Sequence, residues 1–277
     1  MCFTKKQNKN FSDDNEAAKS KPKEENGSKA TPKEEKPKEE KPQEGNTTSN
    51  STEPAAAQVS TSEPAAATTT TTSSTVSPKI AIVIYTMYGH IAKMAESVKS
   101  GIEAAGGTAT IFQIPETLPA EVLTAMHAPA KPDYPIITAD KLPEYNAFLF
   151  GIPTRYGNFP GQWKAFWDTT GALWASGGLA GKYASVFVST GTPGGGQEAT
   201  VLNAMSTLTH HGILYVPLGY STTFGQLTNL DEVHGGSPWG AGTFAAGDGS
   251  RQPSALELEI ATLQGKQFYG VVSKVSF

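Results

Sequence analysis

The chain has 277 residues with a formal net charge of -4, and its single cysteine is Cys2. This weakly acidic balance argues against a nucleic-acid-binding protein, because such proteins present strongly basic surfaces. One cysteine excludes intrachain disulfides and cysteine-rich metal sites.

Residues 1–77 form a low-complexity segment of Lys, Pro and Glu followed by runs of Thr, Ser and Ala. Ordering one residue costs about 1–2 kcal/mol of backbone entropy, and this segment has almost no apolar surface to bury in return. We therefore predict a disordered N-terminal tail at 1–77, followed by one folded domain at 78–277.

The sequence indicates a cytoplasmic protein. No stretch approaches the roughly 20 apolar residues that span a bilayer, and the N-terminus lacks the apolar core of a signal peptide. However, Cys2 lies near Lys5, Lys6 and Lys9, and an acyl chain beside a basic cluster can hold a protein on a membrane. Peripheral association with the plasma membrane through the tail therefore stays open beside the simpler interpretation of an incidental cysteine.

From Pro78 onward, short apolar runs alternate with helix-like segments. Runs without a polar face are typical of parallel strands that helices cover on both sides. Ser254 with Glu257 three positions on predicts a capping box that opens the last helix. We thus predict an α/β fold with a doubly wound, five-stranded parallel sheet. The expected strands are 79–85, 108–114, 146–152, 183–190 and 213–217, and the expected helices are 91–106, 161–174, 197–212 and 254–275.

Ligands of such sheets bind beyond the carboxyl ends of the strands, where loops 86–91, 153–158 and 189–198 are rich in glycine and hydroxyls and poor in charge. A turn before a helix offers unpaired N–H groups and the positive end of the helix dipole, which suit a phosphate. The 86–91 loop has neither the P-loop nor the dinucleotide pattern. We expect it to hold a phosphate monoester without lysine or metal, although a simple turn would have the same residues.

The two later loops could hold a flat heteroaromatic ring, with backbone donors at its edge and aromatic cover from Tyr88, Tyr156 and Trp174. Trp163, Phe166 and Trp167 follow helical spacing and are expected in the core.

Separated motifs along the folded part carry a family resemblance: TMYGHI, GIPTRYGNFPGQWKAFWDTTGALWASGGLAGK, STGTPGGGQE, LTHHG, VPLGY and GDGSRQPS. From Pro78 to the C-terminus the chain resembles the WrbA type of flavodoxin-like NAD(P)H:quinone oxidoreductase. The resemblance implies strand order 2-1-3-4-5 with FMN beside the first strand. It also implies NADH or NADPH as co-substrate, a quinone as acceptor, two-electron ping-pong transfer and an antioxidant role.

The resemblance assigns the site residues, and it implies no catalytic side chain and no metal ligand. Tyr88 would also contact the nicotinamide nucleotide, and Trp174 the quinone. Pro193 departs from the pattern, because it lacks an N–H and one donor at the flavin edge is expected to be missing. The residues implied to bind FMN are Thr86, Met87, Tyr88, Gly89, His90, Ile91, Thr154, Arg155, Tyr156, Ser189, Thr190, Gly191, Thr192, Pro193, Gly194 and His210.

Residues 219–254 are too long for a simple connection. In the family that the chain resembles, a comparable insertion interrupts the fifth strand and helps to build a tetramer. We therefore expect a homotetramer in which Trp239 and Phe244 cover a neighbour's pocket. Two alternatives stay open: a one-electron flavodoxin-type carrier, which is usually strongly acidic around its flavin, and a membrane-associated, non-catalytic flavoprotein scaffold.

Overall fold

The structure is a computed structural model that describes residues 77–277. The predictions for the tail, including a membrane tether at Cys2, lie outside the described residues and stay predictions. No helix in the described part of the chain is long and apolar enough to cross a membrane.

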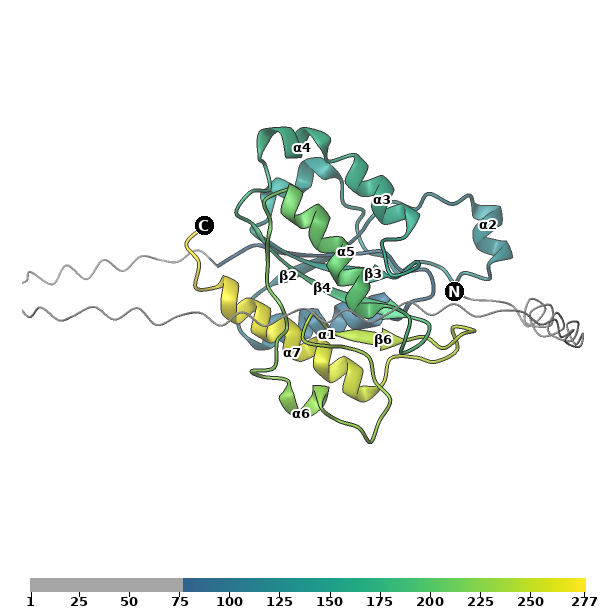
Figure 1. The fold of residues 1–277 in the computed structure, drawn as a ribbon. Helices are drawn as coiled ribbons and strands as arrows, with labels where there is room; N and C mark the ends of the chain where they lie inside the picture. Colours follow the sequence, from purple (N-terminus) through teal and green to yellow (C-terminus); the bar gives the residue numbers. More distant parts are fainter. Residues whose placement is uncertain (1–76) are drawn as a thin grey trace, which may run out of the picture. The chain divides into compact units, whose positions relative to one another are not determined.

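A parallel sheet forms the centre of residues 77–277 (Figure 1). Its strand order is β2-β1-β3-β4-β5, which confirms the flavodoxin-like order. Every residue of β1 and β3 is buried, as expected for strands that are covered on both faces. The strands are β1 (Ile80–Ile84), β2 (Ala109–Gln113), β3 (Ala147–Pro153), β4 (Tyr183–Thr190) and β5 (Leu214–Tyr215).

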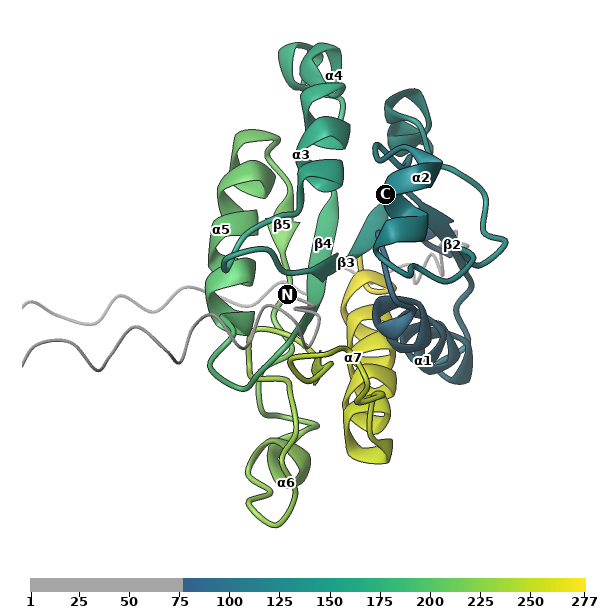
Figure 2. The ribbon, with the colours of Figure 1, turned by 90° about the vertical axis from the view of Figure 1, so that its right-hand side faces the viewer.

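Helices cover both faces of the sheet, and Figure 2 shows the two layers on either side of the strands. On one face α1 (His90–Ala104) and α7 (Ala255–Val272) enclose an aliphatic core. On the other face an aromatic core, with Trp163, Phe166 and Trp167 fully or nearly buried, lies against the strands. The elements on that face include α3 (Gly161–Asp168), α4 (Gly171–Ser176) and α5 (Gln197–His210), and the shorter elements are α2 (Ala120–Ala125), η1 (Ala139–Glu144) and α6 (Phe224–Leu227).

The expected helix 161–174 is in fact two helices, α3 and α4. Thr169 and Thr170 lie at the break, and their hydroxyls donate to the carbonyls of Phe166 and Trp167 at 2.6 and 2.7 Å. Threonine hydroxyls that bond nearby carbonyls compete with the helical pattern. The prediction of a single helix was therefore wrong at these residues.

The fifth position of the sheet is filled by two separate pieces. β5 pairs with the start of β4, whereas β6 (Gly242–Phe244) pairs with its end at Val188–Thr190. The chain leaves the sheet between them, at residues 216–241, so the fifth strand is interrupted as the resemblance implied. β6 was not predicted, because three residues that include a glycine give no recognisable strand pattern.

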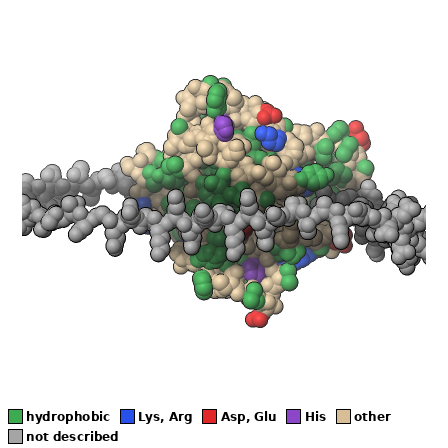
Figure 3. Space-filling view, in the orientation of Figure 1, with side chains coloured by type: hydrophobic (Ala, Val, Ile, Leu, Met, Phe, Trp, Pro, Cys, Tyr) green, Lys and Arg blue, Asp and Glu red, His purple; other side chains and the backbone are tan. Residues whose placement is uncertain are grey.

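This excursion exposes several large apolar side chains at and beside α6. Leu230 is 96% exposed, and Val233, Phe224 and Tyr220 are also exposed. Figure 3 shows hydrophobic side chains at the lower end of the molecule, over α6. We call these four residues the α6 patch.

Helices α1 and α7 approach closely through glycines. A Cβ on Gly101 would lie 1.9 Å from the carbonyl oxygen of Thr262, and one on Gly265 would lie 2.0 Å from that of Val98. Both distances are far below contact, so each position excludes any side chain. The capping box at Ser254 and Glu257 is confirmed and starts α7 at the expected residue.

We predict that Gly265→Ala destabilises the protein, because the new methyl group would force the two helices apart. Overpacking of this kind costs about 1–3 kcal/mol or more. Gly270→Ala in the same helix is the matched control, since nothing lies within 4 Å of its added Cβ, and alanine in a helix gains up to about 1 kcal/mol over glycine. Urea unfolding of both variants measures the difference, and equal stabilities would contradict the close packing.

Candidate functional site

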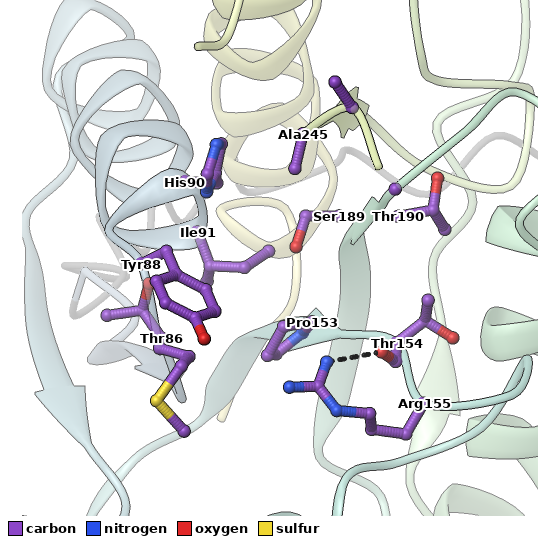
Figure 4. Close-up of a pocket in the computed structure, with 13 residues that line it drawn as sticks. Thr86, Tyr88, His90, Ile91, Pro153, Thr154, Arg155, Ser189, Thr190 and Ala245 are labelled. Atoms are coloured by element: carbon purple, nitrogen blue, oxygen red, sulfur yellow. Dashed lines mark hydrogen bonds between the residues drawn. The ribbon is translucent and has the colours of Figure 1, made fainter. Parts of the chain in front are cut away.

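A hollow opens where β1, β3 and β4 end, at the carboxyl edge of the sheet (Figure 4). Its volume is ≈ 480 Å³ when the space open to solvent is included. The lining contains no carboxylate. The lining residues are Thr86, Met87, Tyr88, His90, Ile91, Pro153, Thr154, Arg155, Ser189, Thr190, Gly191, Ala245 and Ala246.

The 86–91 loop forms one wall and leads directly into α1. Gly89 has φ 90°, a left-handed conformation that suits glycine, and its N–H donates to Thr86 Oγ1 at 3.1 Å. The next N–H groups belong to the first turn of α1, where no intrahelical acceptor exists. These donors and the positive end of the helix dipole favour an anion at this wall.

His90 is buried, and its Nε2 lies 2.8 Å from the carbonyl oxygen of Arg251. A carbonyl can only accept, so Nε2 carries the hydrogen. Burial lowers the pKa of His90, which favours the neutral ring with a single N–H. That N–H is therefore committed to Arg251, and the expectation that His90 donates into the hollow finds no support in this geometry.

The loops after β3 and β4 are joined by hydrogen bonds between their backbones and hydroxyls. The N–H of Thr154 donates to the carbonyl of Ser189 at 2.9 Å, and the Thr154 hydroxyl bonds that of Thr200 at 2.7 Å. Thr190 Oγ1 donates to the carbonyl of Thr192 at 2.9 Å. These bonds hold the two loops at a fixed separation.

Arg155 is the only cation that lines the hollow. Its Nη1 donates to the carbonyl of Thr154 at 3.0 Å, and it makes no ion pair with any described carboxylate. Figure 4 shows its guanidinium directed toward the side that carries Thr86 and Tyr88. An unpaired guanidinium here favours an acceptor-rich or anionic ligand.

A second hollow of ≈ 720 Å³ adjoins the first and shares Thr154, Arg155 and Gly191 with it. Tyr156 lies on its rim with its side chain 85% exposed and φ 56°, in the turn between Arg155 and Asn158. The remaining lining residues are Thr192, Gly195 and Gly247. The two loops therefore border one continuous groove.

The predictions from the sequence missed Ala245 and Ala246, which form the fourth wall. The N–H of Ala245 donates to the carbonyl of Thr190 at 2.8 Å, and its own carbonyl accepts from the N–H of Arg251 at 3.1 Å. Glu257 is fully buried and accepts from Arg251 Nη1 at 2.9 Å and from the N–H of Phe244 at 3.3 Å. The only signal in the sequence was that these alanines precede the GDGSRQPS motif.

A lysine also lies beside the 86–91 loop, although the loop itself has none. Lys131 Nζ donates to the carbonyl of Thr86 at 2.6 Å and pairs with Glu116 at 2.8 Å. Burial raises the pKa of Glu116, but hydrogen bonds from Lys131, the N–H of Leu118 and Tyr85 outweigh it, so the pKa is lowered. The carboxylate therefore stays charged at neutral pH.

Five of the residues predicted to contact a ligand do not line either hollow: Gly89, Trp174, Pro193, Gly194 and His210. His210 is the exposed last residue of α5, roughly 20 Å along the helix from the end that faces the hollow. Trp174 is 59% exposed in α4, which lies away from the carboxyl edge (Figure 1). Pro193 and Gly194 are exposed at the centre of a turn that the N–H of Gly195 closes by donating to the carbonyl of Thr192 at 2.9 Å. Within one chain neither His210 nor Trp174 lines a hollow, so their contacts with the flavin and the quinone stay predictions.

The expectation that Trp239 and Phe244 cover a neighbour's pocket also needs correction. Phe244 is buried in β6 of its own chain, and Trp239 packs near Tyr215. Trp239 is partly exposed, so its contact with a neighbour stays a prediction, whereas the buried Phe244 is not available for one.

Comparison with known proteins gives the family. The sequence model of the NADPH-dependent FMN reductase family matches residues 86–225. The chain belongs to this family. It is 66% identical over 197 residues to Protoplast secreted protein 2 of Saccharomyces cerevisiae, covering 71% of this chain and 99% of that protein.

Other relatives cover the same part of the chain. NAD(P)H quinone oxidoreductase PST3 of Candida albicans is 64% identical over 199 residues, which are 72% of this chain and 100% of that protein. The solved structure of a flavodoxin, a WrbA-like protein from Agrobacterium tumefaciens, has a TM-score of 0.49 and 22% identity, and covers 72% of this chain and 99% of that one.

We predict that Glu257→Ala destabilises the protein by about 3–5 kcal/mol, because it leaves a partly buried Arg251 without its partner. Glu259→Ala is the matched control: this carboxylate is exposed on the same helix and accepts only from Gln226, so its loss should cost at most about 1 kcal/mol. Chemical denaturation measures both. Similar losses for the two variants would show that the buried pair does not hold the fourth wall.

Proposed function

We propose that the chain is an FMN-dependent NAD(P)H:quinone oxidoreductase that reduces quinones by two electrons. The observation that carries the proposal is the hollow at the carboxyl edge, whose lining supplies amides, hydroxyls and one arginine but no carboxylate. Relatives at 59–64% identity are named NAD(P)H quinone oxidoreductase, and the matching family model is that of an FMN reductase.

The residues present fit FMN. A phosphate monoester matches the first turn of α1 and the 86–91 loop, where donors are unpaired and no acidic side chain opposes it. A flat ring matches the groove between the 154–156 and 191–195 segments. A Cβ atom added at Gly195 would lie 2.8 Å from Thr190 Cβ, so only glycine fits at this position. Without a side chain there, the backbone of the loop can lie close to a flat ring.

The protein's own residues position the reactants and shape the charge around them. When bound, FMN would supply the redox chemistry that links NAD(P)H oxidation to two-electron reduction of a quinone. Backbone N–H groups of the 191–195 segment are suited to stabilise negative charge at the ring edge. Pro193 contributes no N–H there, and its side chain is exposed in the turn.

The described residues include no cluster of three or more groups that could hold a metal. Proton transfer by side chains near the hollow is limited, because the N–H of His90 is bound to Arg251 and the Tyr85 hydroxyl has a raised pKa through burial and the adjacent Glu116.

We propose that the two substrates use one groove in turn, which is ping-pong behaviour. Passing electrons in pairs supports an antioxidant role.

We predict that the purified protein is yellow and oxidises NADH or NADPH with benzoquinone, giving parallel double-reciprocal lines. Ala245→Trp should lose FMN and colour, because the indole would fill the hollow that Ala245 lines. Ala172→Trp is the control, since that residue is exposed on α4. A colourless wild-type protein that ignores added FMN would refute the proposal, and absorption spectra with steady-state rates decide it.

We further propose that the protein is a homotetramer. The α6 patch supports self-association, because monomers rarely expose contiguous apolar surface of this kind.

We predict a mass four times that of the chain by light scattering at micromolar concentration with FMN present. Leu230→Asp should lower that mass, because it puts a charge in the α6 patch where the apolar side chain is 96% exposed. The matched control is Val122→Asp, a change at an exposed apolar residue of α2. A wild-type monomer would contradict the proposal.

A further inference from the structure

The segment between β2 and β3 runs beside the first hollow and has no role in the proposed function. None of residues 115–136 is buried, and α2 within it buries no side chain. A segment with so few buried contacts belongs to the low-stability part of a protein unless polar bonds hold it. The polar bonds of this segment therefore determine how firmly it is held beside the hollow.

An ion pair joins the two ends of this segment. Lys131 Nζ lies 2.8 Å from Glu116 Oε2, so residues 117–130 form a surface loop with its ends held together, as in an Ω-loop. Glu116 Oε1 also accepts from the N–H groups of Thr117 and Leu118 at 2.9 and 3.1 Å. We call Glu116 and Lys131 the clasp, and 117–130 the clasped loop.

The clasp is fastened to the wall of the hollow. Lys131 Nζ donates to the carbonyl of Thr86 and lies 4.3 Å from the ring centroid of Tyr85. The Tyr85 hydroxyl in turn donates to Glu116 Oε2 at 2.9 Å. Tyr85 and Thr86 follow directly after β1, so both clasp residues bind the backbone or side chain that begins the 86–91 loop.

The clasped loop then touches a residue of the hollow itself. The Tyr88 hydroxyl donates to the carbonyl of Met126 at 3.2 Å, just after α2. Tyr88 lines the hollow, and Figure 4 shows its ring on the wall formed by the 86–91 loop. Met126 is only partly buried against the core, together with Leu118, Leu123 and Ala128, so the clasp adds to these contacts in holding it in place.

We propose that Glu116 and Lys131 are positioning residues: by closing the clasped loop they hold Met126 against Tyr88 and so fix the Tyr88 ring at the hollow for binding of the nicotinamide nucleotide. This role rests on the proposed function. The clasp residues do not line the hollow, so they act through Tyr88 and not on the ligand. Their effect on global stability is small, since partly exposed ion pairs contribute little to the free energy of unfolding.

The test uses the full chain with FMN bound and compares Glu116→Gln and Lys131→Met with a matched control, Glu121→Gln. Glu121 is an exposed carboxylate of α2 that pairs with none of the described residues. Hydrogen–deuterium exchange in residues 117–130 should become about tenfold faster in both clasp variants and stay unchanged in the control. Lys131→Arg keeps the charge and the donors, and should exchange like the wild type.

Kinetics separate this role from a merely structural one. Both clasp variants should raise KM for NADH or NADPH by about three- to tenfold with kcat nearly unchanged, the signature of lost uniform binding. Tyr88→Phe keeps the ring but removes its bond to Met126, and should raise KM to a similar extent. Adding Glu116→Gln to Tyr88→Phe should raise it no further, because the two changes break one connection.

Two results would overturn the inference. Unchanged exchange in residues 117–130 would show that the ion pair does not close the loop. Faster exchange with unchanged KM, or additive effects of Glu116→Gln and Tyr88→Phe, would show that the loop does not position Tyr88. If the wild-type protein oxidises neither NADH nor NADPH, the proposed function fails and takes the role in nucleotide binding with it, while exchange still decides whether the clasp exists.

Discussion

Glu257 has no exposed surface, yet its carboxylate joins four parts of the chain that are otherwise separate. It accepts from the N–H of Gly235 and from the hydroxyl of Thr243, from the guanidinium of Arg251, and from the N–H of Ser254 that begins α7. Burying a carboxylate is costly unless it is paired and its oxygens are satisfied. Glu257 meets that condition only when β6, the 247–254 segment and α7 are all in place, so these parts fold as a unit.

This requirement explains how an interrupted strand still serves the sheet. β6 is too short to hold its register alone, but Phe244 and Thr243 are bound both to β4 and to Glu257. The position of β6 then sets Ala245 against Thr190, which closes the fourth wall of the hollow. The site at the carboxyl edge therefore depends on a charge buried behind it.

The sequence predicted most of the fold because parallel strands and amphipathic helices carry long patterns. The five expected strands all exist, and the capping box located the start of α7 at Ser254. The prediction failed where a pattern was short or interrupted: Thr169 and Thr170 break one helix through their own hydroxyls, and β6 is only three residues long. Local periodicity cannot report pairings that a distant carboxylate stabilises.

The sequence also predicted most of the candidate site, again because a regular pattern gave the positions of its residues. Loops that follow strands must meet at one edge of a parallel sheet, so Thr86, Thr154 and Thr190 were expected together and do line one hollow. Ala245 and Lys131 were missed, because small or charged residues in irregular segments have no pattern that gives their position. His210 came from the resemblance alone, whereas Trp174 was also expected as aromatic cover for a flat ring, and within one chain neither lines the hollow.

Ion pairs mark the two flexible sides of the site. Three occur among the described residues, and Lys99–Glu103 is a 3.8 Å surface pair within one helix. The other two, Glu116–Lys131 and Glu257–Arg251, hold the segments on either side of the hollow. None of residues 117–130 or 245–254 is buried, so carboxylates that accept from backbone N–H groups contribute to the order of these segments. The pairs differ in exposure: water and salt reach Glu116 and Lys131 but not Glu257. High ionic strength should therefore loosen the wall beside Tyr88 before the wall formed by Ala245.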